Sequence, residues 1–220
     1  VKADEALKDT GDKRYRGLVF KGDIEDFYTT QENVEDKDGK FFAKYVTINS
    51  KDSKELDSPY YAIYSFLGKG GKVTMPAYMD VGEDKNVPIY AVSSSFLTKD
   101  LPTNGIDRII SLEISEGIAA IEEKAFFGAN RLKNVKFPST LIFIGEKAFM
   151  GCGLKGKLEI PKNVAEIGKT AFRDNKSLTD VVILNPNLKF GAGVFDATVT
   201  IHGIKGSTAE EYATKNKLNF

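Results

Sequence analysis

Few residues of this chain have side chains that could perform chemistry. The 220 residues include one cysteine, Cys152, and one histidine, His202. Two such residues are too few for a structural zinc site, and no serine or acid pattern accompanies His202 as a catalytic base. The adjacent acids Glu122 and Glu123 diverge and do not form the facing pair that a glycosidase requires. We therefore interpret Cys152 as a packed thiol and His202 as a surface or capping residue.

Two glycine-lysine segments resemble parts of a phosphate-binding loop. The segment from Gly151 to Lys157 has the right glycine and lysine spacing, but Leu158 replaces the Ser or Thr that would bind magnesium. Gly168-Lys169-Thr170 has the right ending, but Asn163 stands where the first glycine belongs. The sequence predicts no nucleotide site, no metal site and no cofactor, and we expect that the protein is not an enzyme.

Charge and hydropathy exclude other classes of function. The 31 basic and 31 acidic residues give a net charge of zero, so no global field attracts nucleic acid or an anionic membrane. The longest apolar run, Tyr60 to Leu67, is far shorter than the ~20 residues that cross a bilayer. We expect no nucleic-acid partner and no transmembrane segment in this chain.

A repeat of 23 residues organises the C-terminal part of the chain. Phenylalanines recur at this interval, and other apolar positions keep the same step, which indicates a repeat architecture. The aligned columns are Phe126, Phe149, Phe172 and Phe195; Ala125, Ala148, Ala171 and Val194; Ile121, Ile144, Ile167 and Phe190; Leu112, Val135, Leu158 and Val181; and Ile114, Phe137, Ile160 and Ile183.

Each copy has a strand pattern followed by a turn. In Leu158-Glu159-Ile160 apolar residues flank a polar one, which is typical of a short strand. Pro161 follows and ends pairing, because proline has no N–H to donate. Ile144, Ala148 and Phe149 have helix-like spacing, so we expect a short helix or a 3₁₀ turn in this part of the copy.

Such a unit cannot bury its apolar face alone, so neighbouring copies must stack. The expected fold is an α/β solenoid with short parallel strands ~4.8 Å apart and short helices or 3₁₀ turns. The recurring phenylalanines should form its continuous structural spine, namely Phe126, Phe149, Phe172 and Phe195.

The pattern Leu-x-Ile-Pro followed by Ile-Gly-x-x-Ala-Phe resembles the BspA-type leucine-rich repeat family of bacterial and some protozoan surface proteins. The closing segment from Gly203 to Ala213 resembles the terminal motif of such arrays, and the resemblance covers about residues 70 to 220. It implies a leucine-rich repeat right-handed superhelix, a secreted or cell-surface location, and adhesion or protein recognition. The array departs from the pattern at Ser115, Glu122 and Leu184.

The sequence predicts two regions. Residues 1–58 contain no copy of the repeat, and apolar stretches such as Phe41 to Ile48 predict a small β-rich N-terminal module. Residues 59–220 are expected to form the solenoid. Its atypical first coil should contain a strand at Val73 to Pro76, its own Phe at Phe96 and an inserted loop from Asp100 to Asp107.

A helical cap is expected at the C-terminal end, over about residues 203–220. Ser207-Thr208-Ala209-Glu210 has the pattern of a capping box, which predicts a short helix after Ser207. Leu218 and Phe220 should lie on its apolar side and cover the last coil.

The outward positions of the expected strands are the candidate partner-binding residues. Glu113, Lys136 and Glu159 alternate in sign and should pair between neighbouring coils. A solvated face with weak ion pairs is the alternative to a recognition surface. The candidates are Asn134, Lys136, Lys157, Glu159 and Asp180.

We therefore expect a non-enzymatic extracellular or cell-surface module for adhesion or protein interaction, with a protein or extracellular-matrix partner. An alternative is a carbohydrate-binding accessory protein of a surface glycan system. In that case exposed tyrosines of the N-terminal part would stack on sugars, since 13 of the 24 Phe and Tyr precede residue 91.

The proposed spine makes a prediction about stability. Replacing Phe149 by Ala should lower the free energy of unfolding by about 3 to 5 kcal/mol, because a large buried side chain is lost and a cavity remains. Thermal melting of the variant measures this loss. An unchanged melting curve would disprove the assigned register.

Overall fold

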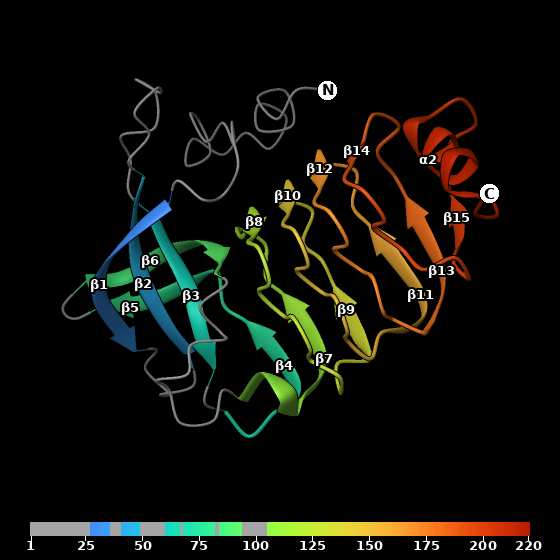
Figure 1. The fold of residues 1–220 in the computed structure, drawn as a ribbon. Coiled ribbons are helices and arrows are strands. Elements are labelled where there is room, and N and C mark those ends of the chain that lie inside the picture. Colours follow the sequence, from blue (N-terminus) through green and yellow to red (C-terminus); the bar gives the residue numbers. More distant parts are fainter. Residues whose placement is uncertain (1–26, 36–40, 49–59, 67, 82–83, 94–104) are drawn as a thin grey trace.

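The computed structural model describes residues 27–35, 41–48, 60–66, 68–81, 84–93 and 105–220. Strands dominate this part of the chain, and from β6 onward they repeat as two rows along the array (Figure 1). The helix α2 closes the end of the array that lies farthest from β1 (Figure 1). Two parts of the expected first coil, Phe96 and residues 100–104 of the inserted loop, lie outside the described residues.

The first row contains the strands that the Leu-x-Ile pattern predicts, paired in parallel. It has two three-stranded parts, in which Leu112 is opposite Val135 and Leu158 is opposite Val181. The two parts meet where the N–H of Lys155 donates to the carbonyl oxygen of Lys133 at 3.1 Å. The strands are β4 (Gly71–Met75), β7 (Ile109–Ile114) and β9 (Asn134–Lys136), and then β11 (Lys155–Ile160), β13 (Ser177–Ile183) and β15 (Thr200–His202).

The second row belongs to a nine-stranded sheet. Its parallel strands are β6 (Asp84–Val92), β8 (Ala120–Ile121), β10 (Phe143–Ile144), β12 (Glu166–Ile167) and β14 (Lys189–Phe190). The sheet continues through β3 (Tyr60–Phe66), which is parallel to β6, and then antiparallel through β2 (Phe41–Ile48) and β1 (Phe27–Glu35). A further strand, β5 (Tyr78–Val81), pairs antiparallel with β6.

Around Phe149 the expected helix does not form, and the expected alternative of a 3₁₀ turn is met only by isolated bonds, such as the one from the N–H of Met150 to the carbonyl oxygen of Lys147 at 3.1 Å. Ile144 ends strand β10, and a run of turns follows it. Lys147 has a φ of 55°, which a right-handed helix does not permit. The N–H of Phe149 donates to the carbonyl oxygen of Ala171 in the next coil at 2.8 Å instead of to its own turn. Among the described residues, helices occur only at η4 (Gly105–Arg108) and α2 (Thr208–Asn216).

The four phenylalanines of the 23-residue column are buried and stack in order. The ring centroids of Phe126 and Phe149 are 5.0 Å apart, those of Phe149 and Phe172 are 5.3 Å apart, and those of Phe172 and Phe195 are 5.5 Å apart. The planes are within 15° of parallel in each pair. Phe137 meets the Phe149 ring edge-on at 5.6 Å, so residues of both rows close the core.

Gly145, Gly168 and Gly191, which follow Ile144, Ile167 and Phe190, permit close contact between coils. A Cβ atom on Gly145 would lie 2.5 Å from the backbone nitrogen of Glu123. Added to Gly168 or Gly191, it would come at least as close to the backbone nitrogen of Glu146 or Lys169. Real Cβ atoms do not approach a backbone this closely, so the motif needs glycine here.

The atypical first coil contributes β4 to the first row. Val73 is opposite Leu112 and Met75 is opposite Ile114, which places the predicted strand in the register of the later copies. The described end of the expected inserted loop, Gly105–Arg108, forms the 3₁₀ helix η4 directly before β7.

The C-terminal helix α2 closes the array. It covers the core of the last coil at the place where a further copy of the repeat would pack. Tyr212 stacks on Phe190 with ring centroids 4.4 Å apart and meets Phe195 edge-on at 6.2 Å. Leu218 also packs against the core, but Phe220 remains 45% exposed, so the expectation that both cover the last coil is only half correct.

The predicted capping box at α2 forms only in part. Glu210 accepts a hydrogen bond from the N–H of Gly206 at 2.5 Å, not from Ser207. The Ser207 hydroxyl makes no hydrogen bond with any described residue, because the N–H of Glu210 already donates to the Ser207 carbonyl oxygen at 3.1 Å.

The glycine column predicts two different costs of adding a methyl group. Gly168→Ala should reduce the free energy of unfolding by about 2 to 4 kcal/mol, because the coils must move apart. Gly193→Ala should cost only about 1 kcal/mol, because its Cβ would touch only Thr170 and its positive φ of 59° is the sole penalty. Urea unfolding of both variants measures the difference, and equal costs would contradict the close-approach role.

Candidate interaction surface

The five candidate partner-binding residues lie on the outward side of the first row. Lys157 and Glu159 are exposed, whereas Leu158, which lies between them, and Ile160, which follows them, are buried. The alternation follows from the strand pleat, which sends successive side chains to opposite faces. Asn134 and Lys136 on β9 are also exposed, and Asp180 on β13 is half-buried.

Lys136 forms an ion pair with the preceding coil. Its Nζ lies 2.6 Å from Oε1 of Glu113, exactly one repeat of 23 residues earlier. The hydrogen bond and the opposite charge lower the pKa of Glu113 and raise that of Lys136. The predicted pairing of alternating charges therefore forms between Glu113 and Lys136. For Glu159 the described part of the chain shows no ion pair.

Asp180 is held by two neighbours, one of which the sequence did not indicate. The hydroxyl of Thr179 donates to its Oδ2 at 2.7 Å, and Nε2 of His202 lies 2.7 Å from its Oδ1. These hydrogen bonds lower the pKa of Asp180, so the contact is present at neutral pH and is lost on acidification through that lowered pKa. His202 is 22 residues away, and only the stacking of β13 on β15 brings the two together.

Cys152 is a structural donor in the core. It is 5% exposed, and its Sγ lies 3.1 Å from the carbonyl oxygen of Phe126. In the next copy Asn175 has the same role, because its Nδ2 donates to the carbonyl oxygen of Phe149 at 2.9 Å. Burial raises the pKa of the Cys152 thiol to about 12, which suppresses the thiolate that a nucleophile needs.

The described aromatic side chains of the N-terminal part are mainly core residues. Phe41 and Phe66 are buried, with ring centroids 5.1 Å apart. Tyr61 and Tyr90 are half-buried, and Tyr78 is 45% exposed. These rings therefore do not add up to the broad exposed platform that stacking on sugars requires.

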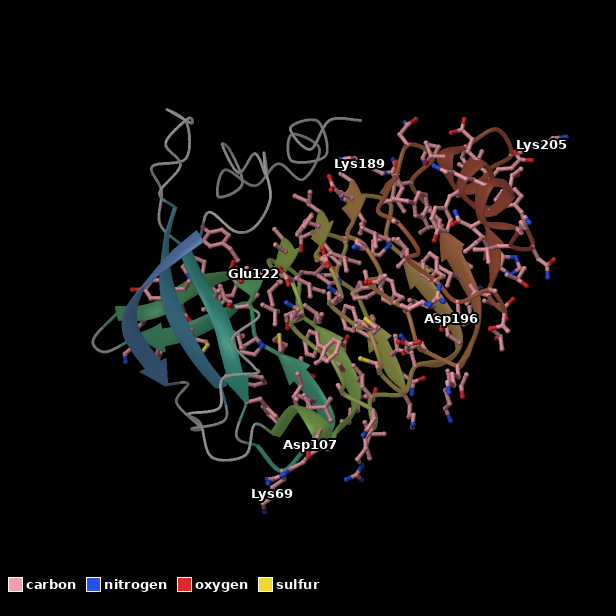
Figure 2. The ribbon with its side chains drawn as sticks, viewed as in Figure 1. Lys69, Asp107, Glu122, Lys189, Asp196 and Lys205 are labelled. Carbon is pink, nitrogen blue, oxygen red and sulfur yellow. The ribbon has the colours of Figure 1, made fainter. Side chains whose placement is uncertain are left out.

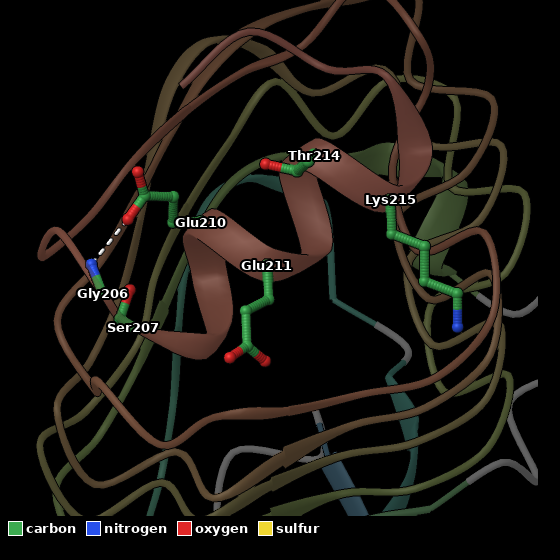
Figure 3. A pocket seen from close by; sticks show the side chains of 6 residues that line it. All are labelled: Gly206, Ser207, Glu210, Glu211, Thr214 and Lys215. Atoms are coloured by element: carbon green, nitrogen blue, oxygen red, sulfur yellow. Dashed lines mark hydrogen bonds between the residues drawn. The ribbon is translucent and has the colours of Figure 1, made fainter.

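An open hollow of about 440 Å³ lies beside α2 (Figure 3). Its chemical groups come from both halves of the helix and from the two residues before it, and Glu210 is already bonded to the N–H of Gly206 (Figure 3). No nucleophile and base face each other in it. The lining residues are Gly206, Ser207, Glu210, Glu211, Thr214 and Lys215.

Parallel strands in a regular stack, with an apolar core repeated coil by coil, define a leucine-rich repeat protein. A family model described as BspA type Leucine rich repeat region matches residues 104–216, in six copies. The chain belongs to this family. The match begins after β4, so the atypical first coil is assigned by strand pairing alone.

Solved structures are similar to this chain at low sequence identity. The pneumococcal vaccine antigen PcpA has a TM-score of 0.53 and 19% identity over 81% of this chain and 51% of that one. A leucine-rich repeat protein from Bacteroides capillosus ATCC 29799 has a TM-score of 0.47 and 21% identity, over 63% and 93% of the two chains. The T. pallidum leucine-rich repeat protein has a TM-score of 0.42 and 17% identity, over 89% and 95%.

The chain spans about half the length of the pneumococcal antigen. Its identity to these proteins is so low that the likeness concerns the fold alone. No curated protein sequence matches the chain. None of the described helices has the length and apolar character to cross a bilayer.

The buried thiol predicts how the native protein responds to thiol reagents and to alkaline pH. At pH 8 a disulfide reagent such as DTNB should leave Cys152 unmodified in the folded protein and label it on addition of urea. The unfolded thiol ionises above about pH 8.5, so the stability from burying it neutral should fall as pH rises from there toward 12. Rapid labelling of the native protein would refute this assignment, and Cys152→Ser is the unlabelled control.

Proposed function

We propose that this chain is a non-enzymatic interaction module that is exported to the cell surface or the extracellular space. In this proposal a right-handed superhelix of residues 59–220 presents the binding face, and residues 1–58 form a small β-rich N-terminal module. The partner is a protein, such as a component of the extracellular matrix. Membership of the leucine-rich repeat family supports this class of function.

The observation that carries the proposal is the outward face of β9, β11 and β13. Its polar side chains stand on parallel strands, of which β9 pairs with β7, β11 pairs with β13, and β13 pairs also with β15. Asn134, Lys157 and Glu159 are exposed, and the described residues offer them no side-chain hydrogen bond or ion pair. They are free to bond to a partner at little cost in reorganisation.

The size of the face also fits a protein partner. Stable protein complexes bury ~1,200 Å² or more in total, which needs a surface several coils wide. The five candidates extend over three successive strands, and a partner of ordinary size would reach the neighbouring coils as well.

A charge-reversal experiment tests the face. The double variant Lys136→Glu with Lys157→Glu should weaken binding to an extracellular-matrix protein by about tenfold or more, because two attractive contacts become repulsive. Its melting temperature should change little, because exposed ion pairs such as Glu113 with Lys136 contribute ~0 to 1 kcal/mol. Surface plasmon resonance at physiological salt measures the binding.

The matched control is Lys169→Glu with Lys205→Glu, which changes net charge equally at exposed positions away from these strands. Equal affinity of the face variant and the unmodified protein would remove this face from consideration. A glycan array run in parallel gives the competing outcome, since glycan binding without protein binding would contradict a protein-interaction role.

A further inference from the structure

Basic side chains gather along the margin of the array where the strands of the first row begin. We define the cationic rim as Lys69, Arg108, Arg131, Lys133, Lys155 and Lys176. All except the half-buried Lys133 are exposed, and none forms an ion pair with another described residue. In Figure 2 this margin starts at Lys69 and Asp107 and continues toward Asp196.

Backbone contacts show that the rim is continuous. Gly70 packs closely on Arg108. A Cβ atom added to Gly70 would overlap the carbonyl oxygen and the Cβ atom of Arg108. Lys133 donates its N–H to the carbonyl oxygen of Ile110 at 2.8 Å, and Lys155 donates to Lys133 at 3.1 Å. Lys155 is then opposite Ser177 in the next strand, directly after Lys176.

The acidic residues near this margin do not neutralise it. Asp196 is bound by Arg173 at 3.2 Å and by the N–H of Asn175 at 2.9 Å. Among the described residues, Asp107 and Asp174 are exposed beside the rim, and these two carboxylates are outnumbered by its six cations. The whole chain has a net charge of zero, so this excess of positive charge is a local feature.

We propose that the cationic rim binds an extended acidic segment of the partner protein. This inference rests on the proposed function and names the chemistry of part of the partner. From β4 to β13 the rim crosses four strand spacings, or about 19 Å at ~4.8 Å each. An extended segment advances ~3.3 Å per residue, so about six residues of a partner fit along it.

Two observations favour an acidic polypeptide over a nucleic acid or a sulfated polysaccharide. Ile110 is 40% exposed between Arg108 and Lys133, and a polypeptide can offer it an apolar side chain whereas a uniform polyanion cannot. A chain with no net charge also lacks the long-range field that draws densely charged polymers. The rim therefore matches a segment in which acidic residues are mixed with apolar ones.

Fluorescence anisotropy of the full chain tests the rim with a labelled peptide of four Asp-Glu-Leu repeats. The unmodified protein should bind it saturably at physiological salt and more weakly at high salt, because exposed charges are screened. The triple variant Arg108→Glu, Arg131→Glu, Lys155→Glu should bind at least tenfold more weakly. The control Lys162→Glu, Lys169→Glu, Lys205→Glu changes net charge equally and should retain the affinity.

Several outcomes would overturn the inference. These are no peptide binding by the unmodified protein, equal losses in the rim and control variants, and equal binding of the uncharged Asn-Gln-Leu peptide. Tighter binding of heparin or single-stranded DNA that the rim variant abolishes would assign the rim to another polymer. Circular dichroism melting confirms that each variant is folded.

The same rim variant distinguishes this inference from the proposed function. If the unmodified protein captures a matrix protein and the rim variant captures it equally well, the proposed function stands and the acidic-segment inference fails. If the unmodified protein captures no protein at all while the acidic peptide binds the rim, the proposed function fails and the rim assignment stands.

Discussion

The structure depends on hydrogen bonds that each turn donates to the following coil. The N–H groups of Phe126, Phe149 and Phe172 all donate to carbonyl oxygens one repeat further along, at 2.7 to 3.0 Å. These bonds fix the distance between neighbouring coils. The phenylalanine rings of neighbouring coils stack with their centroids 5.0 to 5.5 Å apart. Backbone and core therefore impose one register, and a residue inserted within a copy would disrupt both.

This close distance between coils explains why certain positions of the repeat accept few residue types. Where two backbones meet, as at Gly145 and Gly168, no Cβ atom fits. Where a carbonyl oxygen turns inward, a small donor such as Cys152 or Asn175 must reach it. Apolar burial alone accounts for neither column, because glycine contributes little to a core and asparagine is costly there unless it is hydrogen-bonded.

The same stacking places surface chemistry that no single copy contains. Glu113 meets Lys136, and Asp180 meets His202, because positions about one repeat apart become neighbours across the row. The cationic rim forms in the same way from residues that precede successive strands. An interaction surface on this protein is consequently a property of several coils together, which suits an extended partner better than a small ligand.

The sequence by itself determined the 23-residue period, the inward columns, the Leu-x-Ile strands of the first row and the family, because each depends on spacing along the chain. Only the tertiary structure decided that Lys147 adopts a positive φ and that turns replace the expected helix, since the N–H groups of Lys147 and Phe149 find their acceptors in the next coil. It also decided that His202 lies against Asp180 and that the Ser207 hydroxyl has no donor. Periodicity specifies which residues face inward, whereas hydrogen-bond partners and charge neighbours depend on how the coils are stacked.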